Sequence, residues 1–394
     1  MRAFPQQGIK SGWNRRRLGH LIQFRNGKDT KSVEAADGAY PVYGSGGEFK
    51  RADAYLYDGP SILFGRKGTL DKPLLVHGKF WTVDTMFYTI PGPEVDPKFV
   101  HYWALTVPYQ VLSTDTAVPS MTSTDLGQLY IHLPKLETQR AIADYLDRET
   151  AEIDAMTADL DKMEALLTER RAEILRSWFG EQLKNPRAPL ATIAELYIGK
   201  MEQPRQKSAD EIYAPFFHSA NIRPGGMIDL ECSVKHMWFR PDELDHMLLR
   251  KGDVVVVEGG AAGRPGYIAK SVDGWGIQKS VIRARPFEDK VIGKYLFYAL
   301  TFAFEDGQFD LQASLATLAH FPAEKAARFR VPVRSLADQE LVVARLDRDL
   351  SSLSDMLADI TELRDLLAER RAALIAAAVT GQIDIPTAEE PTHA

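Results

Sequence analysis

The sequence predicts an α+β protein with a pseudo-two-fold internal repeat, in which two β-rich, mixed globular domains are joined by two long helices that form an intramolecular antiparallel coiled coil. First, residues 139–175 and 339–375 align without a gap at 13 identities in 37 positions, where unrelated sequences would share about two or three. Second, both segments have a seven-residue apolar period. Third, a β-rich segment with glycine turns precedes each of them. The repeat length of 200 residues is too long for a solenoid.

The repeat divides the 394 residues into five parts. We expect a globular domain at 1–125, a central helical region at 126–185, a second globular domain at 186–325, a second helical region at 326–385 and a disordered tail at 386–394. Residues 181–189, which contain two prolines, are expected to form the linker between the halves.

The two globular domains are predicted to have the same order of elements. In the first, a β-run at 61–64 leads into a glycine-bounded turn at 65–69, and a tryptophan-led β-run at 81–84 and a short helix at 99–106 follow. The second repeats this order with a β-run at 253–257, a turn at 258–264, a β-run at 275–278 and a helix at 294–301. We align the openings on Gly27-Lys28 and Gly199-Lys200, and the short helices on the Ala-Leu-Thr sequences at 104–106 and 299–301.

The two repeated segments are predicted to be helices of roughly 40 residues that begin near Gln139 and Gln339. Apolar residues recur every seven positions at Leu146, Ile153, Leu160, Leu167 and Ile174, and at Leu346, Leu353, Ile360, Leu367 and Leu374. Such a period is typical of a coiled-coil seam. We expect the residues three positions further along to complete the seam, namely Met156, Met163, Met356 and Leu363. One amphipathic helix is usually a core element, but two matched stripes indicate that the helices pair with each other.

Composition narrows the class of protein. The apolar and charged fractions of 45% and 26% are those of a soluble globular protein. No apolar run is long enough to span a membrane, and residues 1–17 lack the apolar core of a signal peptide. The single cysteine, Cys232, fits a reducing cytoplasm. The net charge is −6, but residues 1–125 carry +3, and each helical region carries −4, so the overall charge argues only weakly against DNA binding.

No catalytic or metal site is expected. The chain lacks a P-loop, and it lacks the Asn/Asp-Pro-Pro-aromatic run with which amino-methyltransferases hold the base. The glycine-rich run at 258–263 lacks the spacing of a cofactor loop, so we interpret it as a tight turn. Residues 287–290 include two carboxylates, but no upstream Pro-Asp pair completes a nuclease set. The nine histidines and one cysteine show no metal-ligand spacing.

The remaining candidates for function are loop side chains of both globular domains, which would bind a ligand without catalysing a reaction. Arginine and lysine pair with guanine, asparagine and glutamine pair with adenine, and all of them contact phosphates. An exposed loop side chain is the plainer interpretation of any single residue, but the set lies at matched places in both domains. The candidate DNA-binding residues are Tyr43, Ser45, Arg66, Lys67, Thr69, His218, Ser219, Asn221, Arg223, Arg264, Gln278 and Lys279.

From Trp13 to about Ile385 the chain resembles the specificity (S) subunits of type I restriction–modification systems. The resemblance rests on Tyr-Pro-Val-Tyr-Gly-Ser at 40–45, Gly-Arg-Lys-Gly-Thr at 65–69, Leu-Pro-Lys-Leu-Glu-Thr-Gln at 133–139, Asp147-Arg148, and Thr-Gly-Gln-Ile-Asp at 380–384. Residues 333–339 depart from the pattern, because they lack the proline and the glutamate of the first copy.

The resemblance implies that each globular domain is a target-recognition domain that reads one half of a split site in double-stranded DNA. It also implies that the coiled coil sets the spacing between the half-sites. The expected partners are two modification (methyltransferase) subunits and two motor-nuclease restriction subunits. S-adenosylmethionine, ATP and magnesium are expected on those partners, with no cofactor on this chain, and the complex is expected in the cytoplasm.

Three alternatives stay open at the level of sequence. The chain could be a non-catalytic recognition subunit of a related methyltransferase or of another restriction system. It could be a methyltransferase fused to its own recognition domain, which tight binding of S-adenosylmethionine by the isolated chain would indicate. It could also be a coiled-coil scaffold without DNA specificity, which absent or salt-insensitive DNA binding by the assembled complex would indicate.

Overall fold

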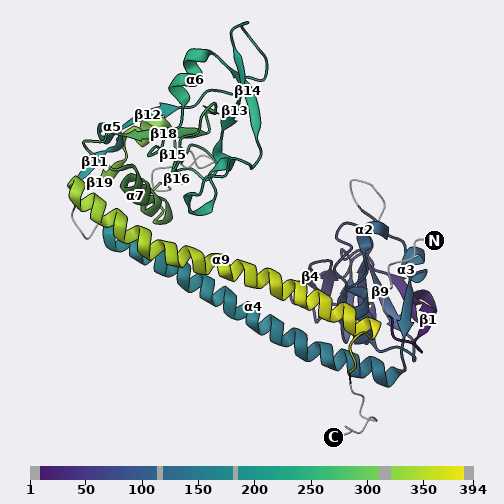
Figure 1. The fold of residues 1–394 in the computed structure, drawn as a ribbon. Coiled ribbons are helices and arrows are strands. Elements are labelled where there is room, and N and C mark those ends of the chain that lie inside the picture. The colour runs from purple at the N-terminus through teal and green to yellow at the C-terminus, as the bar shows by residue number, and fades with distance from the viewer. Residues whose placement is uncertain (1–8, 113–118, 181–184, 310–320, 386–394) are drawn as a thin grey trace. The chain divides into compact units, whose positions relative to one another are not determined.

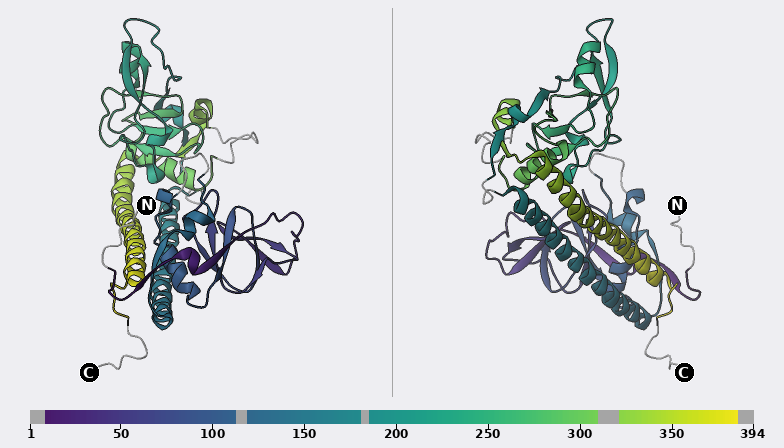
Figure 2. Two further views of the ribbon diagram at one scale, coloured as in Figure 1. Left: turned by 90° about the vertical axis from the view of Figure 1, so that its right-hand side faces the viewer. Right: turned by 60° about the vertical axis from the view of Figure 1, so that its left-hand side comes forward.

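The computed structural model describes residues 9–112, 119–180, 185–309 and 321–385. The chain forms two compact units. Unit 1 consists of Met1–Asp161 and Thr361–Ala394, and unit 2 of Lys162–Ile360. Each unit therefore combines one β-rich part with a portion of each long helix (Figures 1 and 2). We call the β-rich part of unit 1, residues 14–133, head 1, and that of unit 2, residues 187–332, head 2.

Head 1 contains two four-stranded sheets and a two-stranded one. The first sheet has the order β2 (Ile22–Asn26), β9 (Met86–Pro91), β6 (Ser61–Gly65) and β7 (Leu74–Val76). The second has the order β4 (Gly47–Ala52), β3 (Tyr40–Gly44), β8 (Lys79–Thr82) and β5 (Tyr57–Asp58). The small sheet pairs β1 (Asn14–Arg17) with β10 (Tyr130–Leu133). The helices are η1 (Leu18–His20), α1 (Pro97–Ala104), α2 (Tyr109–Leu112) and α3 (Ser123–Gly127).

Head 2 has the same strand order, except that its second sheet, in the described residues, lacks a counterpart of β5. Its first sheet has the order β12 (Ala194–Ile198), β18 (Val281–Pro286), β15 (Val254–Val257) and β16 (Pro265–Tyr267). Its second sheet has the order β14 (Lys235–Phe239), β13 (Ile212–Phe217) and β17 (Gly276–Ile277). The small sheet pairs β11 (Arg187–Pro189) with β19 (Arg330–Pro332). The helices are α5 (Leu190–Ile193), η3 (Ser219–Asn221), η4 (Pro224–Gly226), α6 (Pro241–Met247), α7 (Gly293–Glu305) and α8 (Ala323–Arg328). In both heads the second sheet contains a parallel pair, β3 with β8 and β13 with β17. The predicted repeat of β-rich globules is confirmed.

The prediction that residues 181–189 form a linker is wrong for residues 187–189, and residues 181–184 lie outside the described residues. Arg187–Pro189 is the strand β11, and it pairs with β19 across 143 residues. The two prolines misled the prediction, because an edge strand tolerates proline, which lacks the N–H donor. The expected tail at 386–394 lies outside the described residues.

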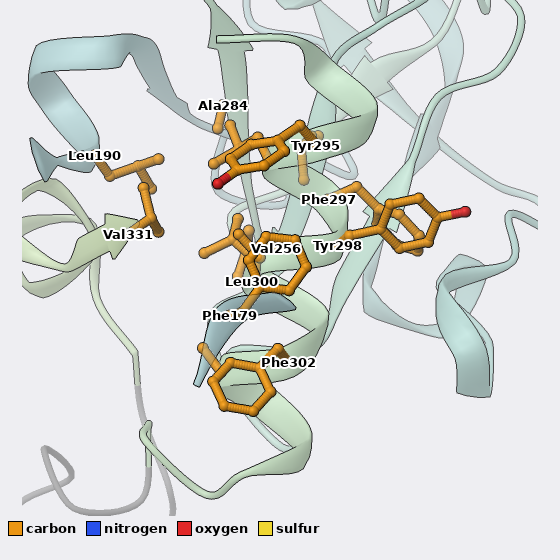
Figure 3. Packing of buried hydrophobic residues seen from close by; sticks show 14 of the residues in the cluster. Phe179, Leu190, Val256, Ala284, Tyr295, Phe297, Tyr298, Leu300, Phe302 and Val331 are labelled. Atoms are coloured by element: carbon orange, nitrogen blue, oxygen red, sulfur yellow. The ribbon is translucent and has the colours of Figure 1, made fainter. Parts of the chain in front are cut away.

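Each head packs around its first sheet. In head 2 all four residues of β15 are buried, because the sheet is covered on one face by α7 and on the other by a second apolar cluster. Figure 3 shows the α7 side, where Tyr295 and Leu300 meet Val256 of β15 and Phe179 of the long helix. In head 1 the equivalent cluster includes Phe64 of β6 and Phe99 of α1.

The long helices are α4 (Leu136–Phe179) and α9 (Leu336–Thr380), of 44 and 45 residues. They pack antiparallel within each unit (Figure 1). In unit 1, Arg364 pairs with Asp161 and Arg371 with Asp154, so residue numbers rise along one helix as they fall along the other. The predicted intramolecular antiparallel coiled coil is confirmed. Among the described residues, no helix is both long and apolar enough to cross a membrane.

The predicted composition of the seam is only half right. All ten residues of the seven-residue stripe are buried or half-buried, as expected. The residues three positions further are instead exposed by 45–52%, at Met156, Met163, Met356 and Leu363. Residues four positions further are buried or half-buried instead, at Thr150, Thr157, Glu164, Arg171, Leu350, Leu357, Arg364 and Arg371. Arg364 and Arg371 pair across the helices, whereas Thr150 contacts Tyr102 of head 1 and Arg171 pairs with Glu305 of head 2. Positions +3 and +4 flank the stripe on opposite sides of a helix, and the polar residues at +4 are accommodated because several of them form ion pairs.

Candidate nucleic-acid interface

Head 1 brings three loops together where β3, β6 and β8 end. The loop after β6 contacts the loop after β8, because Arg66 N donates to Thr85 O at 2.8 Å. The loop after β8 contacts the end of β3, because Val83 N donates to Tyr43 O at 3.2 Å. We call this arrangement the three-loop corner.

The β6–β7 turn presents the predicted basic residues. Lys67 and Thr69 are exposed and Arg66 is half-buried. The Arg66 guanidinium donates to Asp84 O at 3.2 Å and lies 5.9 Å from the centre of the Phe87 ring. No carboxylate in the described residues forms an ion pair with Arg66 or Lys67, so both side chains keep donors for a ligand.

Tyr43 and Ser45 lie at the edge of the same corner. Both are half-buried, and the Tyr43 ring packs edge-on against Phe80 at 6.2 Å. Burial, followed by the nearby Glu48 carboxylate, raises the pKa of the Tyr43 phenol. The phenol is therefore a neutral hydroxyl at physiological pH, which can donate or accept a hydrogen bond.

Head 2 forms the same corner with the same backbone hydrogen bonds. Glu258 N donates to Ser280 O at 2.8 Å, and Gln278 N donates to Phe217 O at 2.9 Å. A third matched bond joins the segment that follows the first strand of the first sheet, β2 or β12, to the corner. It runs from Lys28 N to Thr82 O in head 1 and from Lys200 N to Ile277 O in head 2. The corner is thus a repeated backbone frame.

Glycine is required where the segment that follows β2 or β12 crosses the corner. A Cβ atom on Gly27 would lie 1.9 Å from Val83 O, and one on Gly199 would lie 2.3 Å from Gln278 O. Real Cβ atoms do not approach carbonyl oxygens so closely. The predicted alignment of Gly27-Lys28 with Gly199-Lys200 therefore has a steric origin.

The matched backbone bonds correct the equivalence expected for Arg264. The turn after β15 does correspond to the turn after β6, but the residue that stands where Arg66 stands is Glu258. By the same hydrogen bonds, Lys279 stands where Asp84 stands. Charge is therefore reversed at both positions of the frame. Glu258 is buried, so the difference that a ligand meets is the exposed Lys279 of head 2 in place of the exposed Asp84 of head 1.

Two predicted DNA-binding residues of head 2, Asn221 and His218, form hydrogen bonds within the protein's own loop. Asn221 is fully buried, and its amide accepts from His218 N and donates to Asp229 O and Cys232 O at 2.8 and 3.1 Å. His218 is also buried, and its ring contacts Ser233 O and Ala220 N. These side chains hold the loop after β13, and their burial contradicts their prediction as side chains that contact DNA.

The other predicted residues of head 2 differ in accessibility. Lys279 is exposed. Arg223 is paired with Asp229 at 3.0 Å, and this interaction lowers the pKa of the Asp229 carboxyl. Gln278 accepts a hydrogen bond from Ser280 N at 2.8 Å. Ser219 N and the Arg264 guanidinium also bond within the head, to Ser280 Oγ and to Ile222 O.

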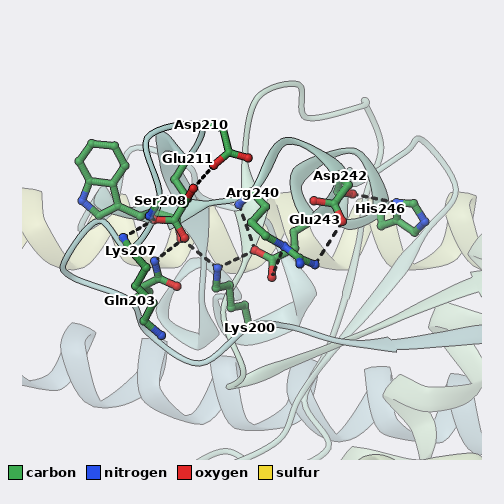
Figure 4. A network of polar contacts seen from close by, with 11 residues as sticks. Lys200, Gln203, Lys207, Ser208, Asp210, Glu211, Arg240, Asp242, Glu243 and His246 are labelled. Carbon is green, nitrogen blue, oxygen red and sulfur yellow. Dashed lines mark hydrogen bonds and ion pairs between the residues drawn. The ribbon is translucent and has the colours of Figure 1, made fainter.

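A polar network that the sequence did not reveal shapes the segment between β12 and β13 (Figure 4). Lys200 Nζ donates to Glu243 at 2.6 Å. Gln203 Nε2 and Lys207 N donate to Glu211 at 2.8 and 2.6 Å. Burial would raise the pKa of Glu243, but the hydrogen bond from Lys200 and further donors lower it. The carboxylates stay charged and hold this segment along β14.

A second repeated feature joins each head to its long helix, and we call it the joint. In unit 1 the Asp147 carboxylate accepts from Lys98 Nζ at 2.5 Å and from Tyr102 Oη at 2.8 Å. In unit 2 the Asp347 carboxylate accepts from Lys294 Nζ at 2.8 Å and from Tyr298 Oη at 2.6 Å. Burial raises the pKa of Tyr102 to about 12, so this phenol stays a donor.

A glutamine completes each joint. Gln139 accepts from Asp96 N at 2.8 Å and donates to Glu94 O and Pro134 O. Gln339 makes the same three bonds, to Ile292 N, Lys290 O and Arg334 O. The repeated glutamine and aspartate of the long helices are therefore the residues that fix each head to its helix.

The joints also correct the predicted alignment of the short helices. Aligning the Ala-Leu-Thr sequences places Phe99 opposite Lys294, whereas the structure places Lys98 there and Tyr102 opposite Tyr298. The sequence alignment is thus one residue out of register. The Lys-x-x-x-Tyr spacing that both helices share would have given the correct register.

Replacing Asp147 with alanine should lower the free energy of unfolding by up to about 1 kcal/mol, because its ion pair with Lys98 is about 40% exposed on both sides. Burial would raise the pKa of Asp147, but the bonds from Lys98 and Tyr102 outweigh it and lower the pKa. The stabilisation is therefore present above the unfolded pKa of about 3.9 and is lost as pH falls through the depressed folded value.

Urea unfolding of the wild type and of Asp147→Ala at neutral pH and at about pH 3 measures this effect. The matched control is Asp144→Ala, an exposed aspartate on the same helix, which should behave as the wild type. If the difference in free energy of unfolding between Asp147→Ala and the wild type stays constant down to pH 3, the role of the charge is contradicted.

Comparisons with known proteins agree with this organisation. A family described as "Type I restriction modification DNA specificity domain" matches residues 10–165. The type I restriction enzyme EcoDI specificity subunit of Escherichia coli is 23% identical over 166 residues, which cover 41% of this chain and 37% of that subunit. The match thus spans little more than a third of the relative's length.

Two solved structures share the fold. One is a chain of a type I R-M (restriction–modification) system, from a study of complex assembly and conformational transition. It aligns with a TM-score of 0.72 and 15% identity, and the alignment covers 95% of this chain and 99% of that chain. The HsdS subunit from Thermoanaerobacter tengcongensis aligns with a TM-score of 0.50 and 15% identity over 95% and 98%. The expected resemblance to type I specificity subunits and the expected fold class are confirmed.

Proposed function

We propose that the whole chain is the recognition subunit of a type I restriction–modification system. The match of residues 10–165 to the family described as "Type I restriction modification DNA specificity domain" supports this proposal. Each head reads one half of a bipartite site in double-stranded DNA. The observation that carries this proposal is the three-loop corner, which is built twice on one backbone frame but with different side chains.

The proposal includes two unlike half-sites. Arginine and lysine donate to guanine, whereas glutamate and aspartate accept from cytosine. Head 1 has Arg66 and Asp84 where head 2 has Glu258 and Lys279. Glu258 is buried, so the accessible difference between the corners is Asp84 in head 1 against Lys279 in head 2. A carboxylate accepts hydrogen bonds and an ammonium donates them, so the two corners favour different bases.

The chain is proposed to be non-catalytic and to act in the cytoplasm with two modification subunits and two motor-nuclease subunits. S-adenosylmethionine, ATP and magnesium would be held by those partners. Among the described residues, no group of three or more histidine, cysteine, aspartate or glutamate side chains is arranged to hold a metal ion. An exposed apolar flank on both long helices supports contact with partner proteins; it consists of Met156, Met163, Leu166, Met356, Leu363 and Leu366.

Mapping methylated adenines in a genome tests the proposal. The chain is expressed with its modification subunits in a host that lacks them. The expected result is a new methylated motif made of two half-sites separated by an unspecified spacer. No new motif with the complete complex, or methyl transfer by the purified chain alone, would contradict the proposed division of work.

The same measurement distinguishes the roles of the heads. Arg66→Ala or Lys67→Ala should relax or weaken one half-site, and Lys279→Ala the other. A lost bidentate base contact costs about 1–3 kcal/mol and relaxes one base position, whereas a lost phosphate contact lowers affinity without changing preference. Lys31→Ala, an exposed lysine of head 1 outside the corner, is the control. Loss of both half-sites in any one of these variants would contradict the assignment of one head to each half-site.

A further inference from the structure

The outer face of the small sheet in head 1 gathers cationic and aromatic side chains. The antiparallel register pairs Arg15 with His132 and Arg17 with Tyr130, so these four side chains lie on one face of the sheet. The opposite face pairs Arg16 with Ile131, which is fully buried against the core of head 1. Strand β1, which bears the arginines, is marked in Figure 1.

Both outer arginines form cation–π contacts with the ring of Tyr130. The Arg15 guanidinium lies 3.7 Å from the centre of the Tyr130 ring, and the Arg17 guanidinium lies 5.6 Å from it. Arg17 Nε also donates to Tyr130 Oη at 3.2 Å. A guanidinium that stacks on a ring keeps its N–H edge available for a bidentate acceptor.

These charges have no acidic partner in the part of the chain that the structure describes. Neither Arg15 nor Arg17 forms an ion pair there, whereas Arg16 on the inner face pairs with Glu94 at 3.2 Å. The hydrogen bond from Arg17 lowers the pKa of the Tyr130 phenol. Burial, followed by the Arg15 charge, lowers the pKa of His132. Positive potential therefore dominates this face.

Head 2 repeats the face at the same place. In its small sheet Ala188 pairs with Val331, which is buried, so the outer face carries Arg187 and Arg330. Each guanidinium donates to the other residue's backbone carbonyl, at 2.9 and 2.6 Å. Within the described residues, neither arginine has a carboxylate partner. Both heads thus keep two outward arginines beside the start of a long helix.

We propose that these two arginine faces bind phosphate groups of the DNA backbone next to each half-site, without regard to sequence. The inference rests on the proposed function, in which the heads bind DNA. The three-loop corners differ between the heads and even reverse charge, but the arginine faces keep their charge. A ligand common to both half-sites therefore suits them, and the phosphodiester is the part of DNA that does not vary with sequence.

The test uses the full chain and a fluorescently labelled duplex of random sequence. Binding is measured by anisotropy over a series of salt concentrations for the wild type, for Arg15→Gln/Arg17→Gln, and for the control Arg16→Gln, whose side chain lies on the inner face. Each phosphate contact contributes about 0.9 to the slope of log K against log salt. The double variant should therefore lose about 1.8 from the slope, and Arg16→Gln should lose nothing. Arg15→Lys/Arg17→Lys keeps the charges and should retain the slope.

The outcomes separate this inference from the proposed function. A wild-type slope in the double variant overturns the inference and leaves DNA recognition by the heads untouched. A double variant that keeps the slope but no longer assembles with the modification subunits also overturns it, because the faces would then bind an acidic protein surface. If the wild-type chain binds no duplex at any salt concentration, the proposed function fails together with the inference.

Discussion

Deleting one heptad from each long helix, residues 158–164 and 358–364, should give a complex that methylates the same two half-sites across a shorter spacer. The deletion preserves the seam, because the stripe and the +4 positions both recur every seven residues. It also preserves the antiparallel register, since both partners lose the same length. Each helix becomes shorter by about 10 Å at 1.5 Å per residue.

Methylation mapping of the doubly deleted chain and of the wild type measures the spacer directly. The control deletes residues 158–164 alone, which shifts the register of α4 against α9 on one side of the deletion and should lower the melting temperature. A doubly deleted chain that changes its half-site bases and keeps its spacer would contradict the role of the helices in setting the spacing.

Leu346→Ala should lower the free energy of unfolding by about 2–5 kcal/mol, the range for a buried leucine that leaves a cavity. Leu346 is 0% exposed, and it belongs to the cluster that joins α9, α4 and head 2. Because the interior is close-packed, neighbouring side chains fill only part of the space that is left.

The matched control is Leu366→Ala, the same substitution on the same helix at a side chain that is 53% exposed. It should change stability by no more than about 0.5 kcal/mol. Thermal and urea unfolding of the two variants provides the comparison. Equal losses of stability in both variants would mean that the seam has been assigned to the wrong face of α9.

The seven-residue stripe could be predicted from sequence because it depends only on spacing along one helix. The flank that closes the seam could not, because it depends on how the partner helix lies. Met163 is apolar and Glu164 is charged, and yet Met163 is 52% exposed and Glu164 is half-buried. Hydrophobicity alone predicts burial of the +3 flank that carries Met163. The ion pairs of Arg364 with Asp161 and of Arg371 with Asp154 across the helices favour burial of the +4 flank instead.

The candidate site shows the same division. The turn that carries Arg66 and Lys67 follows from a buried strand that ends in glycine, so the sequence sufficed to predict it. The role of Asn221 did not follow from the sequence, because its amide bonds to residues 229 and 232 of a loop whose path depends on head 2 as a whole. The equivalence of Arg66 and Glu258 likewise appears only in the backbone hydrogen bonds.

The assembly of unit 1 from both ends of the sequence has a consequence for synthesis on the ribosome. The apolar face of α4 that carries Ile142 and Leu146 packs with Ile375 and Val379, which are translated more than 200 residues later. At about 5–20 residues per second, that face waits on the order of ten seconds or more for its partner. A nascent chain therefore exposes a long apolar stripe during translation, and chaperones or early-binding subunits have that interval in which to cover it.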